Sequence, residues 1–307
     1  MMFRSSPHLR PDAVTACRAA LANLPLGTLL ALPLEQRLQL AATAQSLWHL
    51  RVGVHTGQSM DDVKQHIRAH VDTHGDAKLI EDIELGGKAL AALPLSSAYR
   101  QALGSVGYEI ATLAKQAGGA PMAIAQGAVA TQEQMWKSFS PALFDDMPPF
   151  TVHDDPARRF DFGYDRKNGS IYIGPAPDGR PHFTAGDPAR LAGFVGHEQQ
   201  HHVQHHMATR FLGGKVHDER YADDAAIFAN ERRYGIPSWP TEIFDLNDDP
   251  KAQKQPLFVA AYTHGYRARP TETASFMLEE AVKKEMQPGL QPQGPASGRR
   301  APPVIKL

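Results

Sequence analysis

The stretch "DPARLAGFVGHEQQHHVQHHMATRFLGG", residues 187–214, constrains the fold more than any other part of the chain. Asp187 is a favourable helix N-cap, and Pro188 suits the first helical position. Gly213 and Gly214 favour a helix end. The segment is therefore predicted to form one long helix, and this helix carries five of the chain's fifteen histidines.

A β-hairpin is predicted just before this helix. Two short alternating segments, Phe160–Tyr164 and Ser170–Ile173, flank the sequence "RKNG". Asn168 and Gly169 form a strong signal for a type I′ turn, because both central residues of that turn need a positive φ.

The first part of the chain has the pattern of helices. Apolar residues recur at spacings of three and four from about Pro11 to Phe144, as in "EQRLQLAATAQSLWHL". Ser59 is the predicted N-cap of the helix that starts at "SMDD". The stretches "LGGKALAALP" and "AGGAP" are interpreted as breaks between helices. We interpret this part as a helical scaffold or a region that binds a partner protein.

The predicted fold is α+β and mostly helical. A helical N-terminal region, 1–145, precedes a smaller domain, 146–286, that holds the hairpin and the histidine-rich helix. Two further helices are expected, over "DERYADDAAIFANERR", ended by Gly235, and over "TETASFMLEEAVKKEM". The tail, 287–307, is rich in Pro, Gly and Gln and is predicted to be disordered.

Composition narrows the classes of function. The chain is 42% hydrophobic and 21% charged, which is typical of a globular protein. A net charge of −1 predicts no binding to nucleic acid or to a membrane surface. Cys17 is the single cysteine, so no intramolecular disulfide can form. The apolar stretch 24–34 is interrupted by prolines and starts too late for a signal peptide. We expect a cytoplasmic protein by default, or one translocated without a classical signal peptide.

The long helix contains His197-Glu198-Gln199-Gln200-His201, which is an H-E-x-x-H pattern. Residues four apart on a helix differ by about 40° of rotation and about 6 Å of rise. The two imidazoles can therefore bind one Zn²⁺ ion from the same side. Glu198 lies about 100° round the helix from His197. There it can reach a water molecule at the metal and act as a general base.

The segment resembles the active-site helix of zincin metallopeptidases. As in that family, a hydrophobic residue, Val203, follows the motif, and the residues around it are uncharged: Val195, Gln199, Gln200 and His202. Phe194 departs from the pattern, because a smaller residue is more usual there. The resemblance extends weakly to the hairpin, since zincins place an edge strand before this helix to bind extended substrate. It implies zinc-dependent hydrolysis of a protein or peptide.

The third zinc ligand must come from outside this helix. In metzincins the motif continues to a glycine and a third histidine, but Gln204 and Met207 occupy those positions. His205 cannot substitute, because it lies about 12 Å along the axis from His197. An acid on a later helix is the expected supplier.

Glu272 is the preferred third ligand. The stretch "RPTETASFMLEEAV" resembles the glutamate-bearing helix of gluzincins, in which small residues after the ligand allow close approach of the two helices. One observation opposes this choice, since the apolar stripe of the same helix lies on roughly the opposite side from Glu272. Four other acids therefore remain alternatives: Asp223, Asp224, Glu231 and Glu279. An aspartate at 223 or 224 would suggest an aspzincin-like arrangement.

The resemblance also suggests a donor for the oxyanion of the tetrahedral intermediate. Tyr266 or His264, in "AYTHGYRARPTE", would fit that gluzincin role. A compact zincin behind an unfamiliar helical region, without a signal peptide, further suggests a bacterial toxin or a translocated effector.

The alternative is a non-catalytic, histidine-rich metal-binding or interaction protein. Histidines four apart also occur at 201/205 and 202/206, and such pairs could bind a metal without catalysis. Only His197 is followed by a glutamate. His202, His205 and His206 are otherwise expected to be packing or surface residues.

Overall fold

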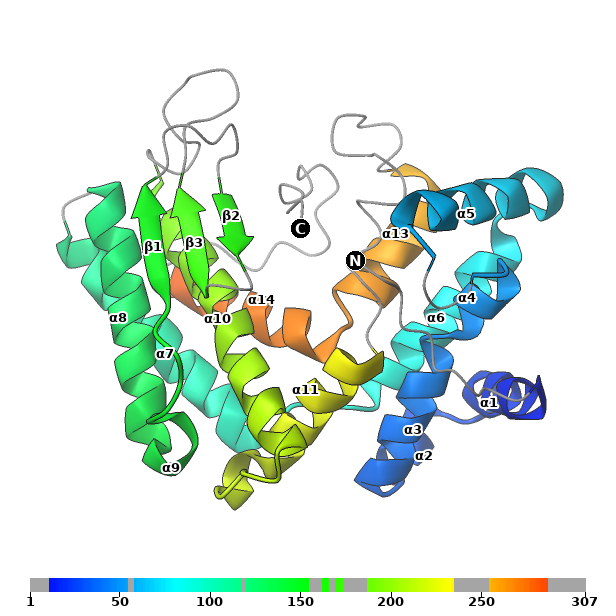
Figure 1. Cartoon of the computed structure of the whole chain (residues 1–307), viewed down its shortest axis with the longest axis horizontal. Coiled ribbons are helices and arrows are strands. Elements are labelled where there is room, and N and C mark those ends of the chain that lie inside the picture. The colour runs from blue at the N-terminus through cyan, green and yellow to red at the C-terminus, as the bar shows by residue number, and fades with distance from the viewer. Residues whose placement is uncertain are drawn as a thin grey trace. The chain divides into compact units, whose positions relative to one another are not determined.

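The computed structural model describes residues 11–54, 58–117, 120–154, 162–165, 169–173, 187–234 and 254–286 (Figure 1). These residues are mostly helical with one small sheet, in agreement with the predicted mostly helical fold. The chain divides into two compact units, Met1–Pro94 with Ile227–Glu272, and Leu95–Ala226 with Thr273–Leu307. The division falls within α11 (Ala222–Tyr234) and within the first turn of α14 (Pro270–Met286).

The first unit is built around α6 (Ala77–Ala91). This helix contacts α1 (Pro11–Asn23), α2 (Leu26–Leu30), α3 (Leu34–Ala44), α4 (Leu47–Arg51), α13 (Pro256–Ala260) and the π-helical turn η3 (Ala261–Tyr266). The N-cap of the helix α5 (Met60–His74) is Ser59, as predicted, and Ser59 also forms a capping box with Asp62. Trp48, Ile67 and Ile83 belong to the core that these helices share.

The break predicted at "LGGKALAALP" falls at the end of that stretch and not at its glycines, because α6 runs without interruption through Gly86 and Gly87 and ends at Ala91. Both glycines are buried, and a Cβ at Gly87 would come within 2.6 Å of the Cβ of His264. The glycines therefore allow η3 to pack closely on α6, and this close packing outweighs their low helix propensity.

The second unit is built around α7 (Ser97–Gln116), α8 (Pro121–Phe139) and α10 (Pro188–Leu212), which pack on one another. The short helix α9 (Pro141–Phe144) and the 3₁₀ turn η1 (Glu219–Tyr221) bring Phe144 and Tyr221 to a cluster of aromatic rings with Trp136 and Tyr99. This division differs from the predicted boundary at 145, because α7 and α8, which precede that residue, pack on α10, which follows it.

The ends of α10 lie where the sequence predicts them. The side chain of Asp187 accepts a hydrogen bond from the backbone N–H of Arg190, and the helix ends before Gly213. Similarly, α11 ends at Tyr234, just before the predicted stop at Gly235, which lies outside the described residues.

The sheet has three strands in the order β1-β3-β2. The predicted hairpin is present, since β2 (Phe162–Asp165) pairs antiparallel with β3 (Ser170–Ile173), and Gly169 has the positive φ of +57° that its turn requires. Asn168 lies outside the described residues. The strand β1 (Thr151–Asp154), which the sequence analysis did not predict, pairs in parallel with β3. The strand β3, which directly precedes α10 in sequence among the strands, is therefore the central one, with β1 and β2 at the edges.

Among the helices of the described ranges, none combines the length and the apolar character needed to cross a membrane. The predicted tail, 287–307, lies outside the described residues.

A buried histidine makes the protein sensitive to acid. His49 is 4% exposed, lies against Trp48, and has a pKa that burial lowers to about 3. In the unfolded chain this imidazole has a pKa near 6.5. The contribution of neutral His49 to the free energy of unfolding is therefore fully present above pH 6.5. It is lost as the pH falls toward 3, by about 1.4 kcal/mol per pH unit.

His49→Leu should remove this part of the acid sensitivity. In urea unfolding, we expect a smaller difference in unfolding free energy between pH 7 and pH 4.5 than in the wild type. The exposed His217→Leu should keep the wild-type difference. The same acid loss in His49→Leu as in the wild type would contradict the assignment.

Candidate metal centre

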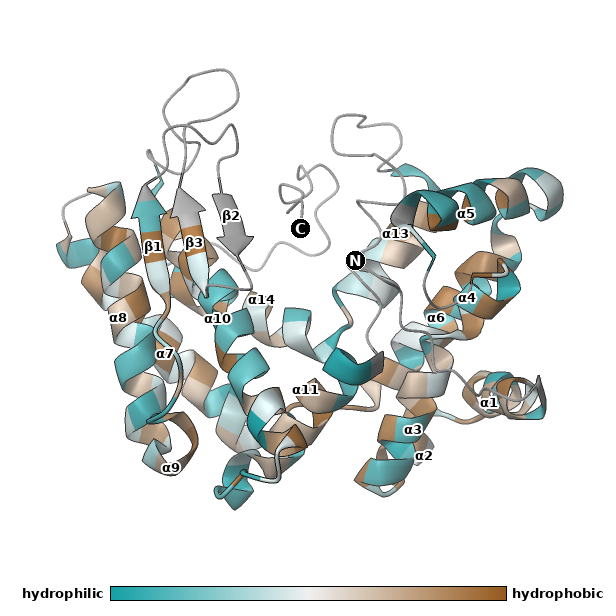
Figure 2. Cartoon of the chain, in the orientation of Figure 1, coloured by the Kyte–Doolittle hydropathy of each residue, from teal (hydrophilic) through white to brown (hydrophobic). Residues whose placement is uncertain are grey.

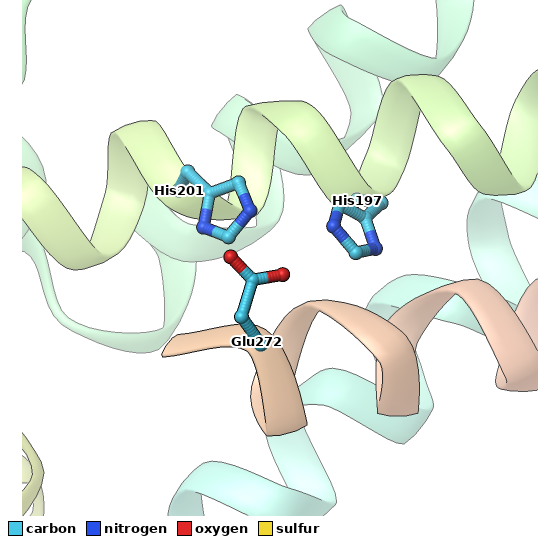
Figure 3. A group of neighbouring side chains, drawn as sticks. All are labelled: His197, His201 and Glu272. Atoms are coloured by element: carbon cyan, nitrogen blue, oxygen red, sulfur yellow. The ribbon is translucent and has the colours of Figure 1, made fainter. Parts of the chain in front are cut away.

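Two glutamines fix the rotation of α10. Figure 2 shows hydrophilic residues along this helix, although most of its side chains are buried. Gln200 donates a 2.6 Å hydrogen bond to the hydroxyl of Tyr99 on α7 and accepts one of 2.9 Å from the amide of Gln132 on α8. The amide of Gln199 donates a 2.9 Å bond to the carbonyl of Val129 on α8. With these side chains directed to α7 and α8, His197 and His201 point toward α14, as Figure 3 shows.

The three predicted ligands lie together. The ligand atoms of His197, His201 and Glu272 are all within 4.8 Å of one another. In Figure 3 the carboxylate of Glu272, from the first turn of α14, lies between the two imidazoles of α10. His197 and Glu272 are 5% and 6% exposed, and His201 is partly buried. The side chains of this cluster therefore come from two helices that are distant in sequence.

The donor set suits zinc. Two imidazole nitrogens and one carboxylate oxygen are typical of zinc sites that keep a position open, and the set contains no thiolate. Bonds of about 2.1 Å to a tetrahedral ion place ligand atoms about 3.4 Å apart. The observed upper limit of 4.8 Å means that side-chain shifts of about an ångström would close the site around an ion.

Glu279 holds His197 rather than joining the ligands. Its Oε2 lies 3.2 Å from Nδ1 of His197, and its Oε1 pairs with Lys283. Burial opposes ionisation of Glu279, but the contacts with His197 and Lys283 outweigh it and lower the pKa to about 2. A carboxylate on Nδ1 orients the ring and leaves Nε2 for a metal.

His201 is oriented by uncharged partners. Its Nδ1 lies 3.1 Å from Oε1 of Gln204 and 3.4 Å from the hydroxyl of Ser275. The amide oxygen of Gln204 can only accept, so Nδ1 donates and Nε2 keeps its lone pair for a metal. Gln204, at the position of the metzincin glycine, thus supports a ligand, and Ser275 is one of the small residues expected to allow close approach.

Glycines on α10 also permit this approach. A Cβ at Gly193 would lie 3.2 Å from Cγ of Glu279, and one at Gly196 would lie 3.5 Å from a methyl group of Leu278. In the sequence, the "GFVG" that precedes His197 carries this signal.

The other candidate acids have other partners. Asp224 accepts hydrogen bonds from the backbone N–H (2.9 Å) and hydroxyl (2.6 Å) of Ser96, the N-cap of α7. Glu231 accepts a 3.0 Å bond from the backbone N–H of Thr271. Asp223 is exposed. None of these acids belongs to the cluster found among the described residues.

The predicted oxyanion donors lie in η3 and are not part of the cluster. His264 packs on Gly87 and lines a small cavity in the first unit together with Asp82. The ring of Tyr266 stacks on that of Tyr262 with centroids 5.8 Å apart. A catalytic role for either residue stays a prediction.

Two of the remaining histidines are packing residues, as expected. Nε2 of His202 donates a 2.7 Å hydrogen bond to the carbonyl of Pro148, and Nε2 of His206 donates one of 2.8 Å to the carbonyl of Leu143. The 202/206 pair therefore uses one nitrogen of each ring to hold the chain before β1.

Comparison of the chain with protein-family models found no match. No significant match was found among curated proteins or among solved structures. The interpretation of the site therefore rests on its own residues.

Substitution should distinguish the histidine pairs. We expect about one zinc ion per purified chain. His197→Ala and His201→Ala should each lose most of it in elemental analysis. His202→Ala and His206→Ala should both retain zinc. His206→Ala should also lose about 1–3 kcal/mol of stability, because it leaves the carbonyl of the buried Leu143 without its donor. Equal zinc loss in all four variants would instead indicate a metal-storage tract.

Glu272→Ala should weaken zinc binding about tenfold or more, without unfolding the protein. Competition with a chromophoric chelator measures the affinity, and circular dichroism checks the fold. Asp223→Ala, an exposed acid, is the control and should bind zinc like the wild type. Loss of the metal in Asp223→Ala with retention in Glu272→Ala would reverse the ligand assignment.

Proposed function

We propose that this chain is a zinc-dependent metallopeptidase with a zincin-like, gluzincin-type site that hydrolyses peptide bonds. The observation that carries the proposal is the position of the Glu272 carboxylate between the imidazoles of His197 and His201. The H-E-x-x-H pattern alone offers two ligands. A catalytic zinc site requires a third protein ligand, and Glu272 on a distant helix would supply it.

The number of ligands favours a catalytic site over a structural one. Structural zinc sites have four protein ligands, whereas catalytic sites have three and keep one position open. Within the described residues the group holds three ligands. When bound, a zinc ion acts as a Lewis acid that makes water nucleophilic near neutral pH and polarises a carbonyl.

Glu198 is the proposed general base. It follows His197 directly and is 4% exposed, and it is not a member of the ligand group. In the mechanism, its carboxylate takes the proton of the attacking water and delivers it to the leaving nitrogen of the peptide. Burial strengthens the electrostatic effect of this carboxylate on the reacting atoms.

Residues behind the ligands support the same function. Glu279 holds Nδ1 of His197, and Gln204 holds Nδ1 of His201. Both rings are therefore oriented before any metal or substrate arrives, which a catalytic site needs in order to keep its ligands in place during turnover. A storage tract would use its histidines equivalently, but His202 and His206 are bonded to backbone carbonyls.

Glu198→Gln is the direct test of the mechanism. The variant keeps the shape of the side chain but cannot accept the proton, so zinc should remain bound while turnover falls by at least about 10²-fold. The assay is cleavage of a mixture of denatured proteins by zinc-loaded protein, followed by gel electrophoresis and mass spectrometry. Glu219→Gln, an exposed glutamate, is the matched control and should cleave like the wild type.

Cleavage by the wild type should stop on addition of a chelator and return with zinc. Near-normal turnover in Glu198→Gln would remove this residue from the mechanism. Zinc binding without any cleavage by the wild type would favour the non-catalytic alternative.

A further inference from the structure

Two buried carboxylates on α11 hold the starts of two other helices. Asp224 binds the backbone N–H and the hydroxyl of Ser96, at the start of α7. Glu231, two turns further along α11, binds the backbone N–H and the hydroxyl of Thr271, at the start of α14. Both acids are buried, and each binds the backbone N–H and the hydroxyl of one residue. Only Glu231 binds a residue, Thr271, that is adjacent in sequence to a proposed metal ligand.

The contacts of Glu231 are extensive. One carboxylate oxygen accepts a 3.0 Å hydrogen bond from the N–H of Thr271. The other accepts bonds from the hydroxyl of Thr271 and from Nε of Arg269, the latter of 2.7 Å. Nη2 of Arg269 lies 2.6 Å from the same oxygen. Glu231 itself is 3% exposed, so both residues that it holds are fixed from inside the first unit.

We propose that Glu231 is a positioning residue that fixes the carboxylate of Glu272 for metal binding. This inference rests on the proposed zinc site. Glu272 directly follows Thr271 and lies in the first turn of α14, where the backbone N–H groups have no partners within the helix. Such a turn frays unless a side chain satisfies those groups.

Anchoring at Thr271 therefore fixes the backbone from which Glu272 projects. A ligand whose backbone is ordered in advance loses less conformational entropy when it binds the ion. Glu231 acts on the metal through Thr271 and does not touch it. Its removal should thus weaken metal binding more than it changes the fold.

Two variants test this role. Glu231→Gln keeps the size of the side chain but removes its charge, and leaves Glu272 as the remaining carboxylate whose charge acts on the partly buried Arg269. Thr271→Val is milder, since it removes only the hydroxyl donor. Asp224→Asn is the matched control, because it weakens an equivalent contact at the start of α7.

Zinc affinity of the full chain is measured by competition with a chromophoric chelator, and thermal unfolding is followed with and without zinc. Glu231→Gln should bind zinc about tenfold more weakly, and Thr271→Val should be affected in the same direction. In both variants zinc should raise the melting temperature less than it does in the wild type. Asp224→Asn should lower the melting temperature without zinc but keep the wild-type affinity within about twofold.

The outcomes separate this inference from the proposed function. Wild-type affinity in both Glu231→Gln and Thr271→Val would overturn the positioning role and leave the zinc site intact. An equal loss of affinity in Asp224→Asn would also overturn it, because the effect would then be one of general stability. Absence of zinc binding by the wild type would overturn the proposed site and this inference together.

Discussion

The candidate site depends first on the rotation of α10 about its own axis. A buried polar side chain needs a hydrogen-bond partner, and α10 carries many such side chains. Gln200 finds its partners on α7 and α8, and Gln199 finds its partner on α8. Any other rotation would leave these amides buried without partners, at a cost of about 1–3 kcal/mol each. One rotation therefore gives the amide groups of both glutamines their acceptors, and it directs His197 and His201 toward α14.

The approach of α14 is the second constraint. Gly193 and Gly196 on α10 provide the space for this helix, and Ser275 on α14 meets the network around His201. The acids Glu279 and Glu272 of α14 then have distinct roles that follow from their partners. Glu279 holds an imidazole, while Glu272 lies between the two rings. Charges that would be costly alone are placed where a cation or a hydrogen-bond donor compensates them.

Local sequence signals predicted the local parts of this arrangement. The caps of α10, the hairpin at Gly169 and the spacing of His197 and His201 each depend on residues close in the chain. The resemblance predicts Glu272 as a ligand, whereas the apolar stripe of α14 predicts that this residue faces away from the core. In the structure α14 is buried both on the stripe, at Leu278, and at Glu272. The parallel strand β1, the glutamine network and the anchor at Glu231 could not be predicted, because each pairs residues far apart in sequence. At Gly86 and Gly87, packing of η3 overrode the local signal for a break.

The central claim is that two imidazoles and one carboxylate, and no further histidine of the tract, hold a zinc ion. X-ray absorption spectroscopy of the zinc-loaded protein tests it most directly, since it reports the type and number of donor atoms. The account predicts four nitrogen and oxygen donors at about 2.0–2.2 Å, with the outer-shell scattering of two imidazole rings. Scattering from three or four imidazoles would contradict it, because histidines beyond His197 and His201 would then bind the metal.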